Sequence, residues 1–122
     1  MALTKAGSNV VSSQSSAAGS AADAVISAAL DLTGAYQSLL TGKITNGATG
    51  PTIGCTVNVY ISRDNWTNPY LFASITGGTA NNGVYPFAFQ LPDAVMYAKI
   101  GFGGNTAQAV TVIADLETIT AI

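Results

Sequence analysis

The chain has 122 residues and a formal net charge of −2, with four Lys and Arg against six Asp and Glu. Charged residues make up 8% of the sequence, whereas about a quarter is usual in soluble domains. So few, dispersed cations exclude a basic surface for nucleic acid. The absence of histidine excludes His-dependent triads and imidazole metal ligands, and the single cysteine excludes an internal disulfide framework.

The N-terminal residues 1–22 are rich in serine, alanine and glycine. Such a segment has little apolar surface to bury, so we expect either a disordered tail or an extended arm that orders on a neighbouring subunit. We therefore divide the chain into a low-complexity N-terminal arm, 1–22, and a β-sandwich domain, 23–122. The serines of the arm that we expect at an interface are Ser12, Ser13, Ser15 and Ser16.

Targeting signals are not found in the sequence. The N-terminal segment lacks the apolar stretch of about 7–15 residues that a secretory signal needs. No window reaches the ~18 apolar residues of a membrane helix. We therefore expect synthesis in the cytoplasm and no membrane partner, and we interpret the formal glycosylation motif at Asn65 as a coincidence.

The segment 20–32 fits two structures. Its start, with Ser20 and Asp23, resembles a capping box, which would begin a short helix. The residues after it also alternate as in a strand. We favour the strand because the later segments are all β and need partners. The inward positions of that strand are Ile26, Ala28, Leu30 and Leu32.

From residue 36 onward, apolar and polar residues alternate in short runs, which is typical of half-buried strands. Turn-forming Asn, Gly, Pro and Asp separate these runs roughly once every ten residues, as in antiparallel sandwiches and barrels. We predict an all-β fold, an antiparallel β-sandwich of jelly-roll type with seven or eight strands. The strands expected after residue 35 are 36–45, 56–62, 70–76, 84–91, 95–102 and 110–117.

The same alternation predicts which side chains face the core. Cys55 stands beside one of these runs, and we expect it to behave as a small buried hydrophobe. The other predicted inward residues are Val57, Val59, Ile61, Phe87, Phe89, Leu91, Met96, Ala98, Ile100, Phe102, Val110, Val112, Ala114 and Leu116.

No catalytic constellation is found in the sequence. Asp115 and Glu117 share one strand face, which we interpret as a solvated face that discourages edge pairing. The glycine-rich run 101–106 lacks the Gly-Lys-Ser/Thr ending of a phosphate loop, so we expect a hairpin turn there. Asp64 is a single carboxylate in its loop, too few for calcium. We predict a non-enzymatic protein with no catalytic residue, no cofactor and no metal.

The loop 63–69 groups aromatic and polar residues. Trp66 lies inside it and Tyr70 follows it directly. Such aromatics could form a sugar-binding platform, cap the open end of a sandwich core or fill a subunit interface. We favour the core or the interface. The candidate interface residues at this loop are Arg63, Asn65, Trp66 and Tyr70.

The low charge itself has a physical consequence. A free monomer uses surface charge to remain soluble, whereas the centres of subunit interfaces are depleted of charge. A surface of Thr, Ser, Asn, Gly and Ala can pack against another protein with little desolvation cost. The composition therefore favours a subunit of a larger assembly.

Strands and turns follow one another in a characteristic order over residues 25–122. The segments that carry it are Asn46-Gly-Ala-Thr-Gly-Pro-Thr52, Val57-Asn-Val-Tyr-Ile-Ser-Arg-Asp64, the Trp66 loop, Tyr70-Leu-Phe-Ala73, Val95-Met-Tyr-Ala-Lys-Ile100 and Gly104-Asn-Thr-Ala-Gln-Ala-Val-Thr-Val112. This order resembles the small structural proteins of tailed bacteriophage particles, of the capsid decoration (cement) type.

The resemblance implies a jelly-roll subunit on the capsid exterior of a virion, made in the host cytoplasm. It implies a homodimer or homotrimer whose partner is the major capsid protein, and it brings no catalytic residues. The arm 1–22 would then reach a neighbouring subunit. The alternative is a carbohydrate- or receptor-binding sandwich of a tail or head fibre that uses Trp66 and Tyr70.

Overall fold

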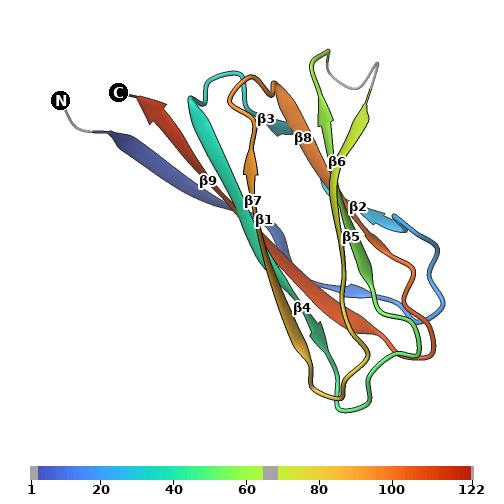
Figure 1. Ribbon diagram of the computed structural model, residues 1–122. Coiled ribbons are helices and arrows are strands. Elements are labelled where there is room, and N and C mark those ends of the chain that lie inside the picture. Colours follow the sequence, from blue (N-terminus) through green and yellow to red (C-terminus); the bar gives the residue numbers. More distant parts are fainter. Residues whose placement is uncertain (1–2, 65–68, 122) are drawn as a thin grey trace.

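The computed structural model describes residues 3–64 and 69–121 (Figure 1). In these residues the chain forms nine strands and no helix, so the predicted all-β class is confirmed. The strands are β1 (Thr4–Ser16), β2 (Val25–Ile26), β3 (Leu30–Asp31), β4 (Gln37–Asn46), β5 (Thr56–Ser62), β6 (Tyr70–Thr76), β7 (Val84–Leu91), β8 (Tyr97–Gly103) and β9 (Val110–Ala121).

The strands build two antiparallel sheets that pack as a sandwich. Sheet A has the order β1-β9-β4-β7, and sheet B has the order β2-β8-β5-β6, with β3 also pairing with β8. Because β2 and β3 both pair with β8, they act as one interrupted strand. The pairs β1–β9, β2/β3–β8, β4–β7 and β5–β6 then nest inside one another along the sequence. This is a long hairpin wrapped into two sheets, which is the jelly-roll arrangement.

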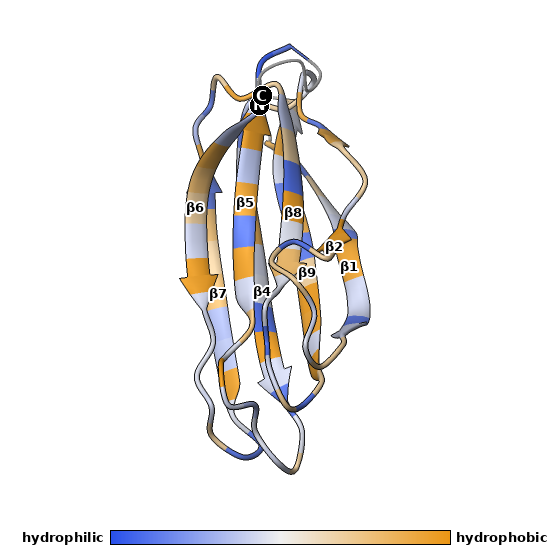
Figure 2. Cartoon of the chain, turned by 90° about the vertical axis from the view of Figure 1, so that its right-hand side faces the viewer, coloured by the Kyte–Doolittle hydropathy of each residue, from blue (hydrophilic) through white to orange (hydrophobic). Residues whose placement is uncertain are grey.

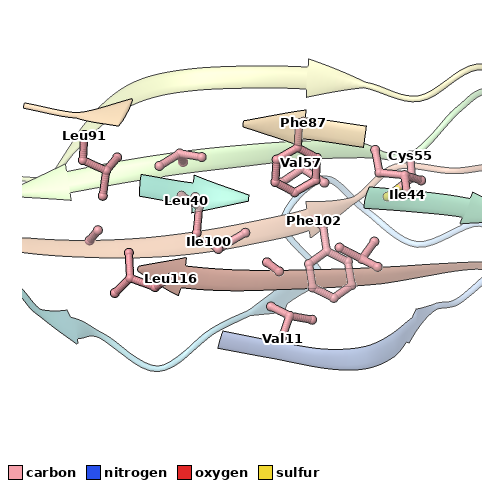
Figure 3. Close-up of a cluster of buried hydrophobic side chains, with 14 of the residues drawn as sticks. Val11, Leu40, Ile44, Cys55, Val57, Phe87, Leu91, Ile100, Phe102 and Leu116 are labelled. Atoms are coloured by element: carbon pink, nitrogen blue, oxygen red, sulfur yellow. The ribbon is translucent and has the colours of Figure 1, made fainter. Parts of the chain in front are cut away.

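The core lies between the inner faces of the two sheets (Figure 3). Figure 2 shows why: hydrophobic and hydrophilic residues alternate along strands such as β5 and β8. One face of each strand is therefore apolar, and sheet packing removes it from water. The predicted inward residues that are fully or almost fully buried are Cys55, Val57, Val59, Phe87, Leu91, Ala98, Ile100, Phe102, Val110, Val112, Ala114 and Leu116.

A glycine in the middle of β4 makes room for the core. Gly42 occupies an inward position between Leu40 and Ile44. A Cβ at this position would lie 2.6 Å from Cζ of Phe87 and 2.3 Å from the carbonyl oxygen of Ile113. The ring of Phe87 therefore fills the volume that a side chain at position 42 would need.

The strand expected over 24–32 is present in two short pieces, and two of its four predicted inward side chains are exposed: Ala28, which lies between β2 and β3, and Ile26. Ile26 pairs with Gly101 and is 56% exposed, so its inward prediction was wrong. The cause is Ser27: its backbone N–H donates to the carbonyl of Ile100 at 2.8 Å, and its Oγ accepts from the N–H of Ile100 at 3.0 Å. A side-chain oxygen thus replaces a ladder carbonyl and interrupts the alternation.

Two further predictions near β8 were wrong. Met96 is exposed because β8 begins one residue later, while the Met96 carbonyl accepts a hydrogen bond of 2.8 Å from the N–H of Leu32. The run 101–106 does not form a hairpin turn, since β8 belongs to sheet B and β9 to sheet A. It is a connection between the sheets, with Gly104 at a φ of 82°.

Most of the segment 1–22, set apart above as an arm, contributes a strand to sheet A. Thr4–Ser16 form β1, which pairs with β9 of the same chain along its whole length. Val11 enters the core, whereas Thr4 to Asn9 are all exposed. From Thr4 to Asn9 the strand is held by its backbone ladder with β9 and buries no side chain, which explains why its composition gives so weak a signal.

The loops at one end of the sandwich are tied to one another. The N–H of Gly19 donates to the carbonyl of Asn105 at 2.8 Å, and the N–H of Thr52 donates to the carbonyl of Thr106 at 3.0 Å. At the opposite end of the sandwich, the start of β1 lies beside the end of β9, because Thr4 pairs with Ala121 (Figure 1). The chain thus has one end closed by bonded loops and one end where β1 and β9 extend together.

Candidate functional site

The part of the chain that the structure describes contains no cluster of three or more His, Cys, Asp or Glu side chains suited to a metal ion. Asp115 and Glu117 point outward from β9, and Asp115 Oδ1 accepts a hydrogen bond of 2.7 Å from Asn9 Nδ2. Burial raises the pKa of the Cys55 thiol, which disfavours the thiolate that a nucleophile needs.

None of the described residues forms a helix of the length and apolar character that would cross a membrane.

The clearest apolar surface lies on β6, an edge strand of sheet B. Tyr70, Leu71 and Phe72 are 55%, 59% and 37% exposed. The pairing with β5 shifts here, because Ala73 lies opposite Val59 while Leu71 lies opposite Tyr60. Phe72 is thus the extra residue of a β-bulge, and bulges redirect side chains at sheet edges.

Beside this edge, the end of the sandwich has a small apolar pocket of about 290 Å³. Tyr70 lies at this pocket and is itself more than half exposed. The other lining residues are Ile61, Ser62, Arg63, Pro92, Ala94 and Val95. The structure therefore brings together two of the predicted interface residues, Arg63 and Tyr70, at one apolar hollow.

Two other predicted interface residues, Asn65 and Trp66, lie outside the described residues. Leu71 and Phe72 were not singled out in the sequence, although three consecutive large apolar residues in an expected strand depart from alternation. That departure was the available signal for an exposed edge. We call Tyr70, Leu71 and Phe72 the β6 edge patch.

The predicted serines of the first segment fall into two groups. Ser12, Ser13 and Ser15 are exposed on β1, and Ser13 has a φ of 49°, which is unusual for a residue other than glycine. Ser16 is completely buried, and its Oγ donates to Asn105 Oδ1 at 2.6 Å. The first three serines can therefore meet another molecule, whereas Ser16 serves the fold.

β1 is itself an edge strand, since among the described strands it pairs with β9 alone. An edge strand presents unpaired backbone groups, which can add a strand from another chain. The ladder is irregular, with register shifts between Asn9 and Val11 and between Val11 and Gln14. Such bulges limit how far a regular strand can be added along this edge.

A polar cluster that sequence reasoning missed covers the outer face of sheet B. Asp23 Oδ1 accepts from Asn58 Nδ2 at 2.9 Å, and the Tyr60 hydroxyl donates to Asp23 Oδ2. The hydrogen bond to Asp23 raises the pKa of Tyr60, and burial adds to the effect. Asp23 fits because Gly101 has no side chain: a Cβ there would lie 2.5 Å from Asp23 Oδ1. The cluster holds the β1–β2 connection against the sheet.

No protein-family model and no curated protein matches this chain. Solved structures do match. A chain in the structure of the infectious bursal disease virus Gx strain is 11% identical, with a TM-score of 0.57, over 97% of this chain and 32% of that one. A chain in a structure of Bacillus endospore appendages, described as disulfide-linked pili, is 14% identical, with a TM-score of 0.51, over 99% of this chain and 93% of that one.

A third similar chain comes from T=1 particles derived from infectious bursal virus. It is 14% identical, with a TM-score of 0.56, over 97% of this chain and 32% of that one. The present chain thus spans about a third of the length of the viral chains that it matches. At these identities the likeness establishes a shared fold, the β-sandwich, and nothing more.

Proposed function

We propose that this chain is a non-enzymatic structural subunit of a bacteriophage particle, a capsid decoration (cement) protein that clamps neighbouring major capsid subunits from the capsid exterior. The observation that carries the proposal is the β6 edge patch, an exposed apolar surface on an edge strand of a chain with 8% charged residues. A soluble monomer rarely leaves such a surface uncovered, so it favours a subunit that is buried in an assembly.

The fold supports the same proposal. The similar viral chains come from virus particles, and the pilus chain comes from a polymeric appendage. Virus particles and pili are both assemblies. Repetition makes a weak contact effective, because each further contact of a bound subunit becomes intramolecular.

We assign two contact surfaces to the decoration role. The first is the β6 edge patch with the neighbouring pocket at Arg63, which would meet the major capsid protein. The second is the exposed part of the segment 1–22, including Ser12, Ser13 and Ser15, which would meet an adjacent subunit along the free edge of β1. A contact of about 800 Å² on each partner is enough for specific binding.

Co-sedimentation tests the proposal. Purified chain is mixed with phage heads that lack it, and the heads are pelleted. We expect saturable binding with a fixed ratio of chain to major capsid protein. Chain that remains in the supernatant at every concentration would contradict the decoration role.

A carbohydrate- or receptor-binding module is the second candidate, and one observation favours it. Tyr70 is exposed beside an apolar pocket, as an aromatic platform for a sugar would be. Under this alternative, Tyr70→Ala abolishes binding to a glycan array and leaves binding to heads unchanged. Under the decoration role, the variant weakens binding to heads and no glycan is bound.

A further inference from the structure

A groove of about 500 Å³ lies on sheet A, where β1, β9 and β4 run side by side at the end with the paired termini. Its lining includes Gly7, Leu39 and Ile119. Leu39 alternates along β4 with the fully buried Leu40, so the groove opens on the outer face, away from the core. Gly7 has no side chain to fill the groove, and Leu39 is 40% exposed.

Two opposite charges lie at this groove. In the register of sheet A, Lys5 lies opposite Ile119 and Gly7 lies opposite Glu117. Lys5 and Glu117 are therefore diagonal neighbours on one face, at the roughly 7–8 Å typical of such positions. In the part of the chain that the structure describes, neither side chain forms an ion pair or a hydrogen bond, and both are exposed.

This pairing of charges is self-complementary. In a two-fold symmetric contact the same patch meets itself, so residue i of one copy contacts residue j of the other and the reverse. A two-fold axis that crosses the line from Lys5 to Glu117 at its midpoint places each ammonium group over the carboxylate of the other copy. This two-fold arrangement contains two intermolecular ion pairs, and the apolar Leu39 and Ile119 lie beside them.

We infer that the outer face of sheet A around this groove is a homodimer interface, in which Lys5 of each copy pairs with Glu117 of the other. The occupant is a second copy of this chain because the groove itself carries the complement of its own charges. Gly7 adds no side chain of its own to this face, and the Cγ of Glu117 would lie 3.8 Å from a Cβ built there, so the glutamate side chain has room beside it. The inference deepens the self-association that the proposed function includes, and it rests on that part alone.

Sedimentation velocity of the purified full chain, from micromolar to millimolar concentration, is the first test. We expect a monomer–dimer equilibrium that weakens as ionic strength rises, because exposed ion pairs are screened. A monomer over the whole range would overturn the inference.

Reversal of the charges tests the residues. Lys5→Glu and Glu117→Lys each place like charges opposite one another, so we expect the dissociation constant to rise about tenfold in either variant. The double variant restores opposite charges, so its dissociation constant should return to within about threefold of the original. Single variants without effect, or a double variant weaker than both singles, would overturn the pairing.

Asp93→Lys is the matched control, because it changes the charge by the same amount as Glu117→Lys, at an exposed loop residue outside the groove. We expect the dissociation constant of this variant to stay within about twofold of the original, because an exposed charge outside the interface contributes little to association. An effect as large as that of Glu117→Lys would show that net charge, rather than this groove, governs association, and would overturn the inference.

A measurement on the unmodified chain removes the dependence on variants. Equal amounts of ¹⁴N- and ¹⁵N-labelled chain are mixed and treated with a carbodiimide, which joins an amine to a nearby carboxylate. We expect a mixed-isotope peptide that links Lys5 to Glu117. Mixed-isotope links only at other residues would overturn the inference. Binding to heads is a separate readout, so failure of the dimer and failure of the decoration role are distinguishable.

Discussion

The Ser16 hydroxyl donates a hydrogen bond of 2.6 Å to Oδ1 of Asn105, and Nδ2 of Asn105 donates back to the Ser16 carbonyl at 3.1 Å. Both residues are completely buried. Nδ2 of Asn105 also donates to the carbonyl of Gln108 at 2.8 Å. One amide thus joins the end of β1 to the connection between β8 and β9, and fixes the first strand to the sandwich.

Replacing this amide should destabilise the fold strongly. Asn105→Ala removes the partner of one buried carbonyl, that of Ser16, and of two part-buried carbonyls, and it takes from the Ser16 hydroxyl its shortest hydrogen bond, so we expect a loss of about 2–4 kcal/mol in the free energy of unfolding. Ser16→Ala should cost about 1–2 kcal/mol. Chemical denaturation measures both. Ser15→Ala is the control, because Ser15 is exposed, and it should stay within about 0.5 kcal/mol of the original. Equal effects at positions 15 and 16 would contradict the account.

Gly42 gives a second prediction, since a methyl group at this position overlaps the Phe87 ring and a backbone carbonyl of β9. We expect Gly42→Ala to lower the free energy of unfolding by about 1–3 kcal/mol. Gly47→Ala is the matched control, because nothing lies within 4 Å of a Cβ built there. Thermal unfolding of the two variants should separate them, and equal melting temperatures would contradict the packing described.

The β6 edge patch gives a prediction on binding. Leu71 is 59% exposed, so Leu71→Ser should lower the free energy of unfolding by less than about 1 kcal/mol. Phe72 is only 37% exposed, so Phe72→Ser also loses buried contacts and should cost about 1–2 kcal/mol. Each should weaken co-sedimentation with heads about tenfold, because the lost contact is repeated in every copy. Val84→Ser is the matched control for Leu71→Ser, because Val84 is exposed to a similar degree on β7, and its loss should leave binding unchanged. Equal binding by all three variants would contradict the assignment of the patch.

Tyr60 provides a pH-dependent test. Its hydrogen bond to Asp23 raises the pKa of the phenol in the folded chain. The stability from this bond is therefore complete below the unfolded pKa of about 10 and is lost as the pH rises through the folded pKa. In a spectrophotometric titration, one of the five tyrosines should ionise late. Asp23→Asn should move its pKa back toward the ordinary value, and an unchanged titration would contradict the role of Asp23.

The architecture could be predicted because alternation is a property of nearly every strand. Val57 and Val59 on β5, and Val112 and Ala114 on β9, follow it without interruption and are buried as expected. Prediction failed where a side chain takes the place of a backbone group. The Oγ of Ser27 accepts a hydrogen bond from the N–H of Ile100, and the alternation is interrupted there, so the side chain of Ile26 is exposed.

The candidate site was only partly predictable, for a related reason. Tyr70 is exposed at the end of the sandwich as expected for an interface residue, but Leu71 and Phe72 join it only because of a β-bulge. A bulge depends on pairing with β5, which a single segment does not reveal. The groove at Lys5 and Glu117 depends in the same way on the pairing of the first strand with the last.

The central claim is that the chain occurs in many copies on a phage head. The most direct test is its copy number in purified particles, measured by quantitative mass spectrometry against the major capsid protein. We predict hundreds of copies per particle, in a fixed ratio to that protein. A handful of copies per particle, as a tail or fibre component would give, or the absence of the chain from particles, would contradict the account.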